Sequence, residues 1–260
     1  MSNERSRLPP SFSTTVGTQA IARQAYSSRA RRIYWPGAAP GAGEPVTRMG
    51  AVQVTPQLES YVESLLPERD AVLRRLEEEI ETTGVPGIGP AVGQLMYLLL
   101  RMAGCRDAIE LGCAVGYSAI WLGRGCTGEV VTTELDPDRA AAARRNLAEA
   151  GLADRVRVVE EDGIACLERE ERQVDCIFND LLNSFPDQAT VDRCFAASLR
   201  RLRPGGLLLA DNALRRGEVL RPGSRGARNV ARYNELVAAE PRLDSLIVPL
   251  RDGVSIARLR

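Results

Sequence analysis

Glu110-Leu111-Gly112-Cys113-Ala114-Val115-Gly116-Tyr117-Ser118 is the stretch that decides the fold. It overlaps a short apolar run, Ala108–Leu111, that predicts a buried strand, and its glycines allow a tight turn and a close approach to a ligand. The next apolar run, Val130–Thr133, is followed by Glu134, 18 residues beyond Gly116. An acid at that place can accept hydrogen bonds from both hydroxyls of a ribose. Because the glycine spacing is G-x-x-x-G and lacks the three-glycine pyrophosphate signature, the segment predicts a nucleoside ligand without a diphosphate.

Around this segment, short apolar runs alternate with helical patterns from Gly104 onward, which predicts an α/β fold with a mostly parallel, doubly wound sheet. The expected strands are Ala108–Leu111, Val130–Thr133, Val156–Val159, Cys176–Asn179 and Leu207–Ala210. Helices are expected around Ala119–Leu122, Arg139–Ala150, Ile164–Arg169 and Thr190–Arg203. Two last apolar runs, Leu243–Pro249 and Gly253–Leu259, meet at Arg251-Asp252-Gly253 and predict a hairpin.

Three helices are expected ahead of this core. Thr55-Pro56 is a capping pattern, and apolar residues recur at helical spacing after it; further helices are expected over Glu68–Thr83 and Ala91–Met102. We therefore predict one domain over residues 49–260, with N-terminal helices at 55–103 and the α/β core at 104–260.

Residues 1–48 differ in composition from the rest of the chain. Residues 1–43 hold six arginines and a single acid, Glu4, in a background of Ser, Pro, Gly and Ala. This composition predicts a disordered tail. An ordered substrate lid or dimer arm, an organellar transit segment, and a true start at Met49 are the alternatives.

The bulk composition excludes several classes. Hydrophobic content of 44% and charged content of 26% are ordinary for a soluble globular protein, and the longest apolar run, Leu95–Leu100, is too short to span a bilayer. The six cysteines form no C-x-x-C pair, so we expect buried free thiols and cytoplasmic residence. The chain has no histidine, and all 34 of its basic residues are arginine, which cannot act as a base.

Polar residues follow the last three strands of the expected core. Asp162-Gly163 follows the third strand and is placed to meet an adenine edge, Asp180 follows the fourth strand, and Asp211-Asn212 follows the fifth. Because parallel strands end at one edge of the sheet, Asp180, Asp211 and Asn212 are expected to lie together. Their oxygens suit a hard cation such as Mg²⁺, although Asp and Asn are also frequent as turn caps.

With these residues the chain from Thr55 to Arg260 resembles the cation-dependent O-methyltransferase family that includes catechol and caffeoyl-CoA O-methyltransferases. The matching stretches are Gly89–Leu95, Glu110–Ser118, Glu134–Pro137, Phe178–Asp180, Arg203–Gly206, Asp211-Asn212 and Asp252-Gly253. The resemblance implies a Rossmann-like, seven-stranded sheet with an antiparallel last strand, usually in a homodimer. It implies that Asp180, Asp211 and Asn212 bind the metal. It also implies a cofactor, S-adenosylmethionine, surrounded by Ile88, Glu110, Gly112, Tyr117, Ser118, Glu134, Asp162, Gly163 and Asp180.

The chain departs from the family at two places. Asn183 stands where members usually have the lysine taken as general base, and Arg215-Arg216 stands where an aromatic residue is common. The following loop adds Arg221, Arg225 and Arg228. We take Asp180 and Asn183 as the catalytic positions, although asparagine cannot accept a proton.

Methyl transfer requires a nucleophile free of its proton, and a phenol has a pKa near about 10. Since a divalent cation lowers the pKa of a bound hydroxyl, metal could replace the missing lysine. The leading hypothesis is therefore a metal-assisted O-methyltransferase acting on a small, catechol-like acceptor. A tRNA-modifying methyltransferase and a catalytically impaired binding protein are the alternatives; a nicotinamide dehydrogenase is disfavoured by the missing third glycine.

Overall fold

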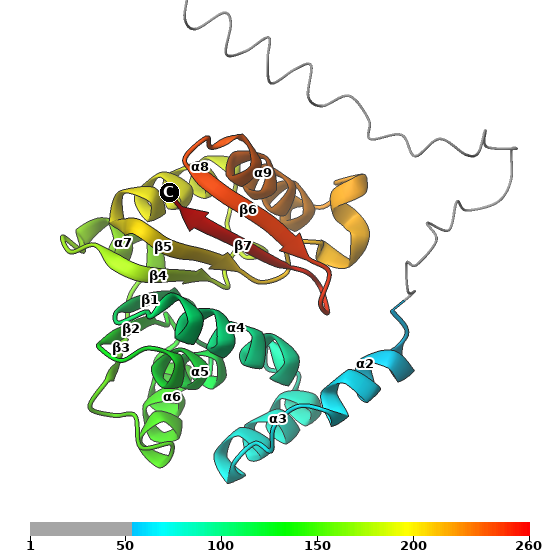
Figure 1. Cartoon of the computed structure of the whole chain (residues 1–260), viewed down its shortest axis with the longest axis vertical. Coiled ribbons are helices and arrows are strands. Elements are labelled where there is room, and N and C mark those ends of the chain that lie inside the picture. The colour runs from blue at the N-terminus through cyan, green and yellow to red at the C-terminus, as the bar shows by residue number, and fades with distance from the viewer. Residues whose placement is uncertain (1–53) are drawn as a thin grey trace, which may run out of the picture. The chain divides into compact units, whose positions relative to one another are not determined.

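The computed structural model describes residues 54–260, in which strands and helices alternate along the chain (Figure 1). The strands are β1 (Ala108–Leu111), β2 (Val130–Thr133), β3 (Val156–Val159), β4 (Val174–Asn179), β5 (Leu202–Ala210), β6 (Leu243–Val248) and β7 (Val254–Leu259). The helices are α2 (Pro56–Ser64), α3 (Ala71–Thr83), α4 (Gly89–Ala103), α5 (Tyr117–Gly125), α6 (Pro137–Glu149), α7 (Gly163–Arg169), α8 (Gln188–Arg201), the 3₁₀ segment η1 (Arg215–Leu220) and α9 (Arg225–Ala239). The predictions for the 1–48 tail, and for a start at Met49, lie outside the described residues.

The seven strands form one sheet in the order β3-β2-β1-β4-β5-β7-β6. Strands β1 to β5 pair in parallel, and β7 runs antiparallel to both of its neighbours, β5 and β6. The chain order changes direction at β1, between β2 and β4. The predicted seven-stranded, mostly parallel sheet with an antiparallel last strand is confirmed, and a ligand is expected at this switch point.

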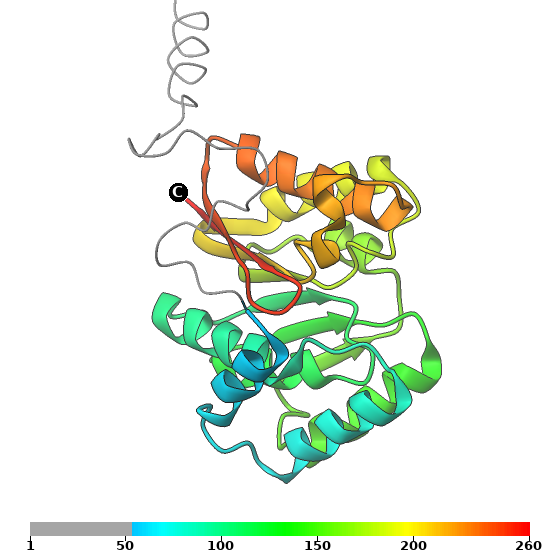
Figure 2. The same cartoon turned by 90° about the vertical axis from the view of Figure 1, so that its right-hand side faces the viewer.

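Helices cover both faces of the sheet, with α4, α5 and α6 on one side and α7, α8 and α9 on the other (Figures 1 and 2). Successive strand residues alternate between the two faces, so Ala108 belongs to the core under the first group of helices and Ile109 to the core under the second. Both cores are apolar. Strands buried on both faces in this way explain why the sequence shows continuous apolar runs instead of alternation.

The expected strands β1, β2 and β3 have the bounds that the sequence predicts, while β4 and β5 begin earlier. Strand β5 begins at Leu202 and contains Pro204 and two glycines, residues that usually argue against a strand. Helix α9 was not predicted. It begins after the Ser224 cap and buries Val230, Tyr233 and Val237, a helical spacing that the run of arginines before it obscures.

The predicted hairpin is confirmed by β6 and β7, whose turn holds Arg251 at φ 49° and Gly253 at φ 86°. All six cysteines are free and buried, as expected. No helix among residues 54–260 is long and apolar enough to cross a membrane.

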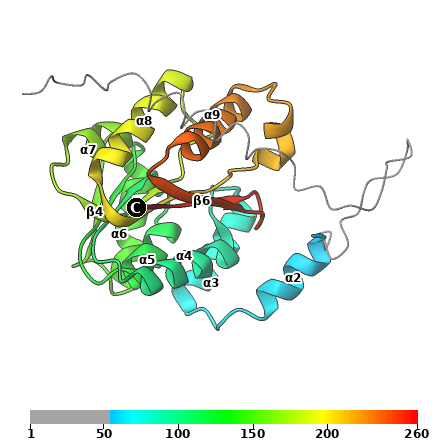
Figure 3. The same cartoon turned by 45° about the horizontal axis from the view of Figure 1, so that its top comes forward.

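Helix α2 differs from the other α-helices of residues 54–260 because none of its residues is buried. Figure 3 shows it beside α3 and away from the sheet. Its Thr55 cap and first-turn proline make it start where the sequence predicts.

Candidate active site at the carboxyl edge of the sheet

Backbone strain in residues 54–260 gathers at one edge of the sheet. Five non-glycine residues have a positive φ, and all of them lie in loops at the carboxyl ends of strands: Ala114, Asn212, Arg215, Arg216 and Arg251. Left-handed backbone costs a residue with a side chain about 1 to 2 kcal/mol, and it persists where surrounding contacts hold it. Such clustering is typical of functional sites, and this edge also holds nearly all of the predicted site residues.

Glu110, the penultimate residue of β1, is completely buried. Its Oε2 accepts a hydrogen bond from Thr132 Oγ1 at 2.5 Å, while its Oε1 is buried and has no partner among the described residues. Burial raises the pKa of Glu110 to about 7, against the lowering effect of the Ser118 and Thr132 hydroxyls. A buried carboxylate oxygen without a donor is suited to a ligand ammonium, such as the amino group of S-adenosylmethionine.

The glycine loop turns as the sequence predicts, with Gly112 at φ 84° and Gly116 at φ 89°. The atoms that come close to these two glycines, however, belong to neighbouring parts of the protein. A Cβ on Gly116 would lie 3.1 Å from the Cα of Ala143 on α6, and one on Gly112 would lie 2.5 Å from Leu181 Cδ2. These glycines therefore let α5 and the loop pack against neighbouring elements, a role that the sequence pattern did not separate from ligand approach.

Tyr117 and Ser118 form the first turn of α5. The Tyr117 ring is buried, and its hydroxyl donates to Glu77 Oε1 on α3 at 2.8 Å. That side chain thus belongs to the packing of α3 on α5, and a contact with the cofactor would have to come from its backbone. The N-terminus of α5 has no side-chain cap, so its first N–H groups are available to a ligand carboxylate.

Glu134 follows β2 and already accepts two backbone hydrogen bonds. Ala114 N donates to Oε2 at 2.9 Å and Asp136 N donates to Oε1 at 3.0 Å. These bonds fix the carboxylate against the glycine loop and explain how Ala114 is held at φ 46°. Each oxygen keeps a lone pair for a ribose hydroxyl.

The two residues predicted to lie beside the adenine, Asp162 and Gly163, also have structural roles. Asp162 caps α7, since its Oδ1 accepts from Ala165 N at 2.9 Å. Gly163 is buried, and a Cβ there would lie 3.0 Å from Thr133 Oγ1. Ile88 is fully buried at the start of α4. One oxygen of Asp162 is thus used as a helix cap, and its Oδ2 remains for a ligand.

The acidic residues after β4 and β5 come together as the sequence predicts. Asp180 and Asp211 are close enough to raise the pKa of Asp180: burial contributes most, then the charges of Asp211 and Glu110, while Arg251 lowers it. Burial likewise raises the pKa of Asp211 to about 6. Asp211 Oδ1 is buried and has no hydrogen-bond partner within residues 54–260. Two neighbouring carboxylates with an unpartnered oxygen form a site where a cation is favoured.

Asn183 and Asn212 lie against each other in this cluster. Asn183 Nδ2 donates to Asn212 Oδ1 at 2.7 Å, and Asn212 Nδ2 contacts Asp211 Oδ2 at 3.3 Å. The Asn183 Oδ1 atom is buried without a partner. Asn183 thus contacts the predicted ligand set directly, and Asn212 must share its carbonyl oxygen or turn its amide to bind a metal.

The part of the chain that the structure describes has no group of three or more His, Cys, Asp or Glu side chains placed to hold a metal. The predicted set is of another kind, because it pairs two carboxylates with an amide. Buried orphan oxygens on Asp211 and Asn183 show that the residues present suit a hard cation.

Arg251 is a site residue that sequence reasoning missed. It lies in the β6–β7 turn, its Nη1 donates to the carbonyl of Gly87 at 3.1 Å, and its charge lowers the pKa of both Asp180 and Asp211. The turn was predicted from Asp252-Gly253, but nothing local in the sequence indicates that the turn meets the segment before α4.

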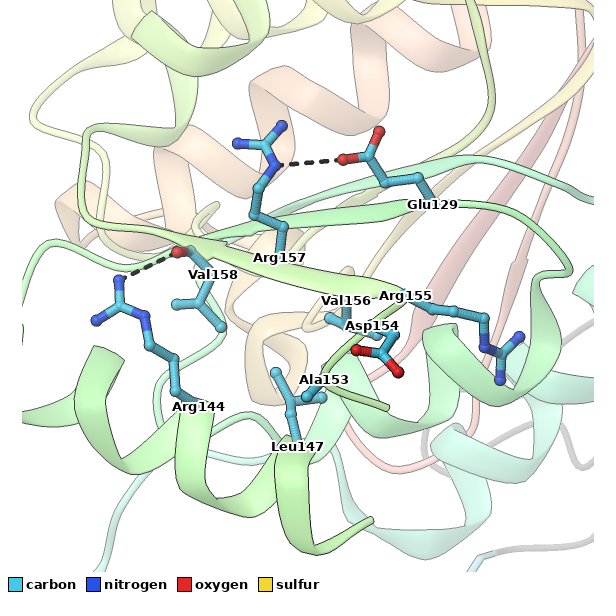
Figure 4. A pocket seen from close by; sticks show the side chains of 9 residues that line it. All are labelled: Glu129, Arg144, Leu147, Ala153, Asp154, Arg155, Val156, Arg157 and Val158. Carbon is cyan, nitrogen blue, oxygen red and sulfur yellow. Dashed lines mark hydrogen bonds and ion pairs between the residues drawn. The ribbon is translucent and has the colours of Figure 1, made fainter. Parts of the chain in front are cut away.

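A cavity lies elsewhere in the described residues, along the edge strand β3 and beside α6 (Figure 4). It has a volume of about 440 Å³ and contains none of the predicted site residues. Two of its arginines already have partners, since Arg157 pairs with Glu129 at 3.2 Å and Arg144 donates to the Val158 carbonyl at 3.1 Å. Because the cavity lies away from the carboxyl ends of the strands, it is not our candidate for the functional site.

Comparison with known proteins places this geometry in context. The sequence profile of the O-methyltransferase family matches residues 67–260. The chain is 31% identical over 223 residues to a catechol O-methyltransferase of Niastella koreensis, covering 79% of this chain and 97% of that protein. It is also 31% identical to a probable O-methyltransferase of Mycobacterium tuberculosis over 194 residues, covering 72% of this chain and 84% of that one.

Solved structures show the same fold. An O-methyltransferase of Bacillus cereus in complex with S-adenosylhomocysteine superposes with a TM-score of 0.69 at 30% identity, over 78% of this chain and 97% of that one. An O-methyltransferase of Streptomyces achromogenes involved in tomaymycin synthesis, in complex with S-adenosylmethionine, gives a TM-score of 0.67 at 28% identity over 78% and 96%. Both structures hold the cofactor, or its product, that the glycine loop and Glu110 predict for this chain.

Proposed function

The chain belongs to the O-methyltransferase family, and we propose that it transfers the methyl group of S-adenosylmethionine to a hydroxyl of a small, catechol-like aromatic acceptor with the help of a divalent cation. The observation that supports this most directly is the pairing of two features at one edge of the sheet. Glu110 has an unpartnered oxygen for the cofactor, and Asp211 has one for a cation. The name of the Niastella koreensis relative, catechol O-methyltransferase, supports the acceptor class.

The cofactor would lie across the ends of β1 and β2. Glu110 would accept from its ammonium, the uncapped first turn of α5 would donate to its carboxylate, and Glu134 would accept from its ribose. Asp162 Oδ2 would lie at the adenine. These groups bind and orient the methyl donor without changing its chemistry, so the alignment of sulfur, methyl and acceptor oxygen is their main contribution.

The metal site would consist of Asp180, Asp211 and Asn212. A Mg²⁺ ion held there would lower the pKa of an acceptor hydroxyl by several units. Burial raises the pKa of Asp180 and of Asp211 and so favours their protonated forms. A bound cation would favour the ionised forms instead, because its positive charge offsets the repulsion between the two carboxylates. Asn183, which lacks a basic atom, would position the Asn212 amide through the bond that joins them.

Two alternatives have separate tests. The five arginines of residues 215–228 favour tRNA as an acceptor, and salt-dependent tRNA binding would detect it. The asparagine at position 183 favours a chain that binds the cofactor but transfers nothing, and an acceptor screen would detect that.

We further propose a homodimer, supported by the exposed apolar side chains of α2. Tyr61 on this helix is 60% exposed, Leu65 directly after it is 67% exposed, and Met102 at the end of α4 is 83% exposed. A helix with apolar residues and no buried ones needs a partner surface to be stable.

The experiment that tests the proposed function is methyl transfer to catechol-type acceptors, measured with and without EDTA. Loss of turnover in chelator and its return with Mg²⁺ is the expected result. Full turnover in chelator would remove the metal from the account.

A further inference from the structure

We propose that the acceptor has an anionic substituent, a carboxylate, and that Arg215 binds it; this inference rests on the proposed O-methyl transfer. The starting observation is the Nε atom of Arg215, which is buried and has no hydrogen-bond partner among residues 54–260. A guanidinium N–H withdrawn from water without an acceptor is costly, and a ligand carboxylate would satisfy it with a charge-assisted bond.

Arg215 lies beside the predicted reaction centre. Arg215 follows Asn212, one of the predicted metal ligands, by three residues. Its backbone N–H donates to the carbonyl of Asn212 at 3.1 Å. A Cβ atom added to Gly226 would lie 3.2 Å from Arg215 Nε and 3.3 Å from the backbone oxygen of Asn183, so these two atoms lie on the same side of Gly226. The guanidinium therefore lies near the backbone of Asn183 and the first turn of α9.

The backbone holds Arg215 in this place at a cost. Arg215 and Arg216 are consecutive residues at φ 47° and φ 50°, a conformation that glycine adopts far more easily. The bond from Arg216 N to Asp252 Oδ1 and the bond from Leu214 N to the Asp252 carbonyl (2.8 Å) attach the loop to the β6–β7 turn. Strain maintained by neighbouring contacts is typical of residues that position a functional group.

The charge around Arg215 is not neutralised. Residues 213–228 contain five arginines and one acid, Glu218, and no ion pair within 4.0 Å joins any of these arginines to an acid in the described part of the chain. Glu218 instead accepts from Ser224 Oγ at 2.8 Å. The cavity beside β3 shows the contrast, since its Arg157 is paired with Glu129. The positive end of α9, which begins at Arg225, adds to the field that favours an anion.

A small acceptor is favoured over a nucleic acid because Arg215 is only partly exposed and its Nε atom is buried. A phosphate backbone is read by exposed side chains spread over a surface, whereas one partly buried guanidinium near the backbone of Asn183 suits a carboxylate on the same ring as the reacting hydroxyl.

The test compares two acceptors that differ in one charge, 3,4-dihydroxybenzoate and its methyl ester. The wild-type chain with Mg²⁺ is expected to prefer the acid in kcat/KM by about tenfold or more, the worth of a charge-assisted hydrogen bond. R215Q is expected to lose this preference while keeping turnover of the ester, and R215K to keep part of it. R258Q is the matched control, because Arg258 is exposed on β7 and pairs with Leu207 at the opposite edge of the sheet.

An unchanged acid-to-ester ratio in R215Q, with a thermal melt like that of the wild type, would overturn the proposal. If the wild type methylates neither compound, the proposed function is contradicted, and titration of the protein with acid and ester in the presence of S-adenosylhomocysteine and Mg²⁺ then decides the role of Arg215. Tighter binding of the acid that R215Q removes supports it; equal binding overturns it. A loss of tRNA binding in R215Q with no change in the ratio would also overturn it.

Discussion

Glu110 shows how a single buried carboxyl can be both costly to the empty protein and useful to the loaded one. Its folded-state pKa of about 7 lies above the ordinary value of 4.5, so the folded state binds a proton more tightly than the unfolded state. The free energy of unfolding should therefore fall as the pH rises from about 4.5 to about 7. A bound ammonium reverses the preference, because the ionised carboxylate then has a partner.

The E110Q variant tests this directly. We expect it to lose the component of the pH dependence of thermal stability between about pH 4.5 and 7, and to bind S-adenosylhomocysteine about tenfold or more weakly, because the charge-assisted bond is gone. Melting curves across the pH range and calorimetry measure the two effects. E149Q, which changes an exposed glutamate paired with Arg75 at 2.7 Å, is the control. Wild-type affinity in E110Q would show that Glu110 does not contact the cofactor.

Asp211 makes a second residue-scale prediction. Its pKa is raised to about 6 by burial, so its ionised form costs stability at neutral pH and D211N should melt at the same temperature or higher. The rate of methyl transfer should nevertheless fall by at least about 100-fold, because mutating even a residue that only supports a metal ligand lowers metal affinity or activity by about 10- to 100-fold. Turnover and melting are measured at pH 7 on the same samples. D244N, at an exposed residue of β6, should change neither; normal turnover in D211N would remove Asp211 from the metal site.

At this scale the sequence predicted the strand-end acids well and their partners poorly. Asp180 and Asp211 follow from the rule that parallel strands end at one edge. The Asn183–Asn212 bond and the approach of Arg251 to Gly87 join residues 29 and 164 positions apart, and no local pattern encodes such contacts.

The element scale is where glycine has its clearest role. Gly116 and Gly104 both have positive φ, but only Gly116 faces another backbone, that of Ala143 on α6. A substitution at Gly104 meets nothing within 4 Å. The two positions therefore separate the cost of a left-handed backbone from the cost of displacing a helix.

We expect G104A to lose about 1 kcal/mol of unfolding free energy and G116A to lose about 1 to 3 kcal/mol more, because overpacking adds to the backbone cost. G116A should also bind S-adenosylhomocysteine more weakly, since α5 and the glycine loop would shift together. Chemical denaturation of both variants gives the comparison. Equal losses would mean that α5 and α6 adjust to the added methyl group without strain.

The sequence predicted helices and strands correctly where apolar residues form uninterrupted runs. It failed where proline, glycine or arginine stand among the apolar residues. Strands β1 and β2 match because all of their side chains are buried, and β3 matches because the apolar Val156 and Val158 are buried on either side of the exposed Arg157. Strand β5 begins early because Leu202 pairs with Val174 of β4, while Pro204 lies in the irregular stretch before Leu207 pairs with Cys176, a place where proline is tolerated. Helix α9 begins in an arginine-rich segment, so its buried Val230 and Tyr233 were not recognised as a helical face.

For the whole molecule, the homodimer makes the next prediction. Changing Tyr61 of α2 and Leu65 at its C-terminal end together to glutamate should convert a dimer to a monomer, because two charges cannot be buried in an apolar interface without partners. Light scattering coupled to size exclusion measures the mass. The change of Leu246, which is 65% exposed on β6, to glutamate is the control. A wild-type mass in the α2 variant would place the interface elsewhere.

The order of motifs, rather than any one of them, predicted the whole molecule. A glycine pair is common, but strand, glycine loop, acid, second acid and a closing hairpin in that sequence are compatible with few folds. Composition could not reveal the acceptor, because we expect its specificity to come from the tail and from residues 181–187 and 213–228, whose arrangement in space composition does not describe. The neutral total charge also concealed a basic loop beside an acidic cluster.

The most direct test of the central claim is methyl transfer by the full chain from S-adenosylmethionine to 3,4-dihydroxybenzoate, followed by mass spectrometry, in EDTA and after addition of Mg²⁺. Metal-assisted O-methylation predicts a product about 14 Da heavier than the acceptor, whose formation stops in EDTA and resumes when Mg²⁺ is added. The same product formed at the same rate in EDTA, with S-adenosylhomocysteine still bound through Glu110, would contradict the role of Asp180, Asp211 and Asn212.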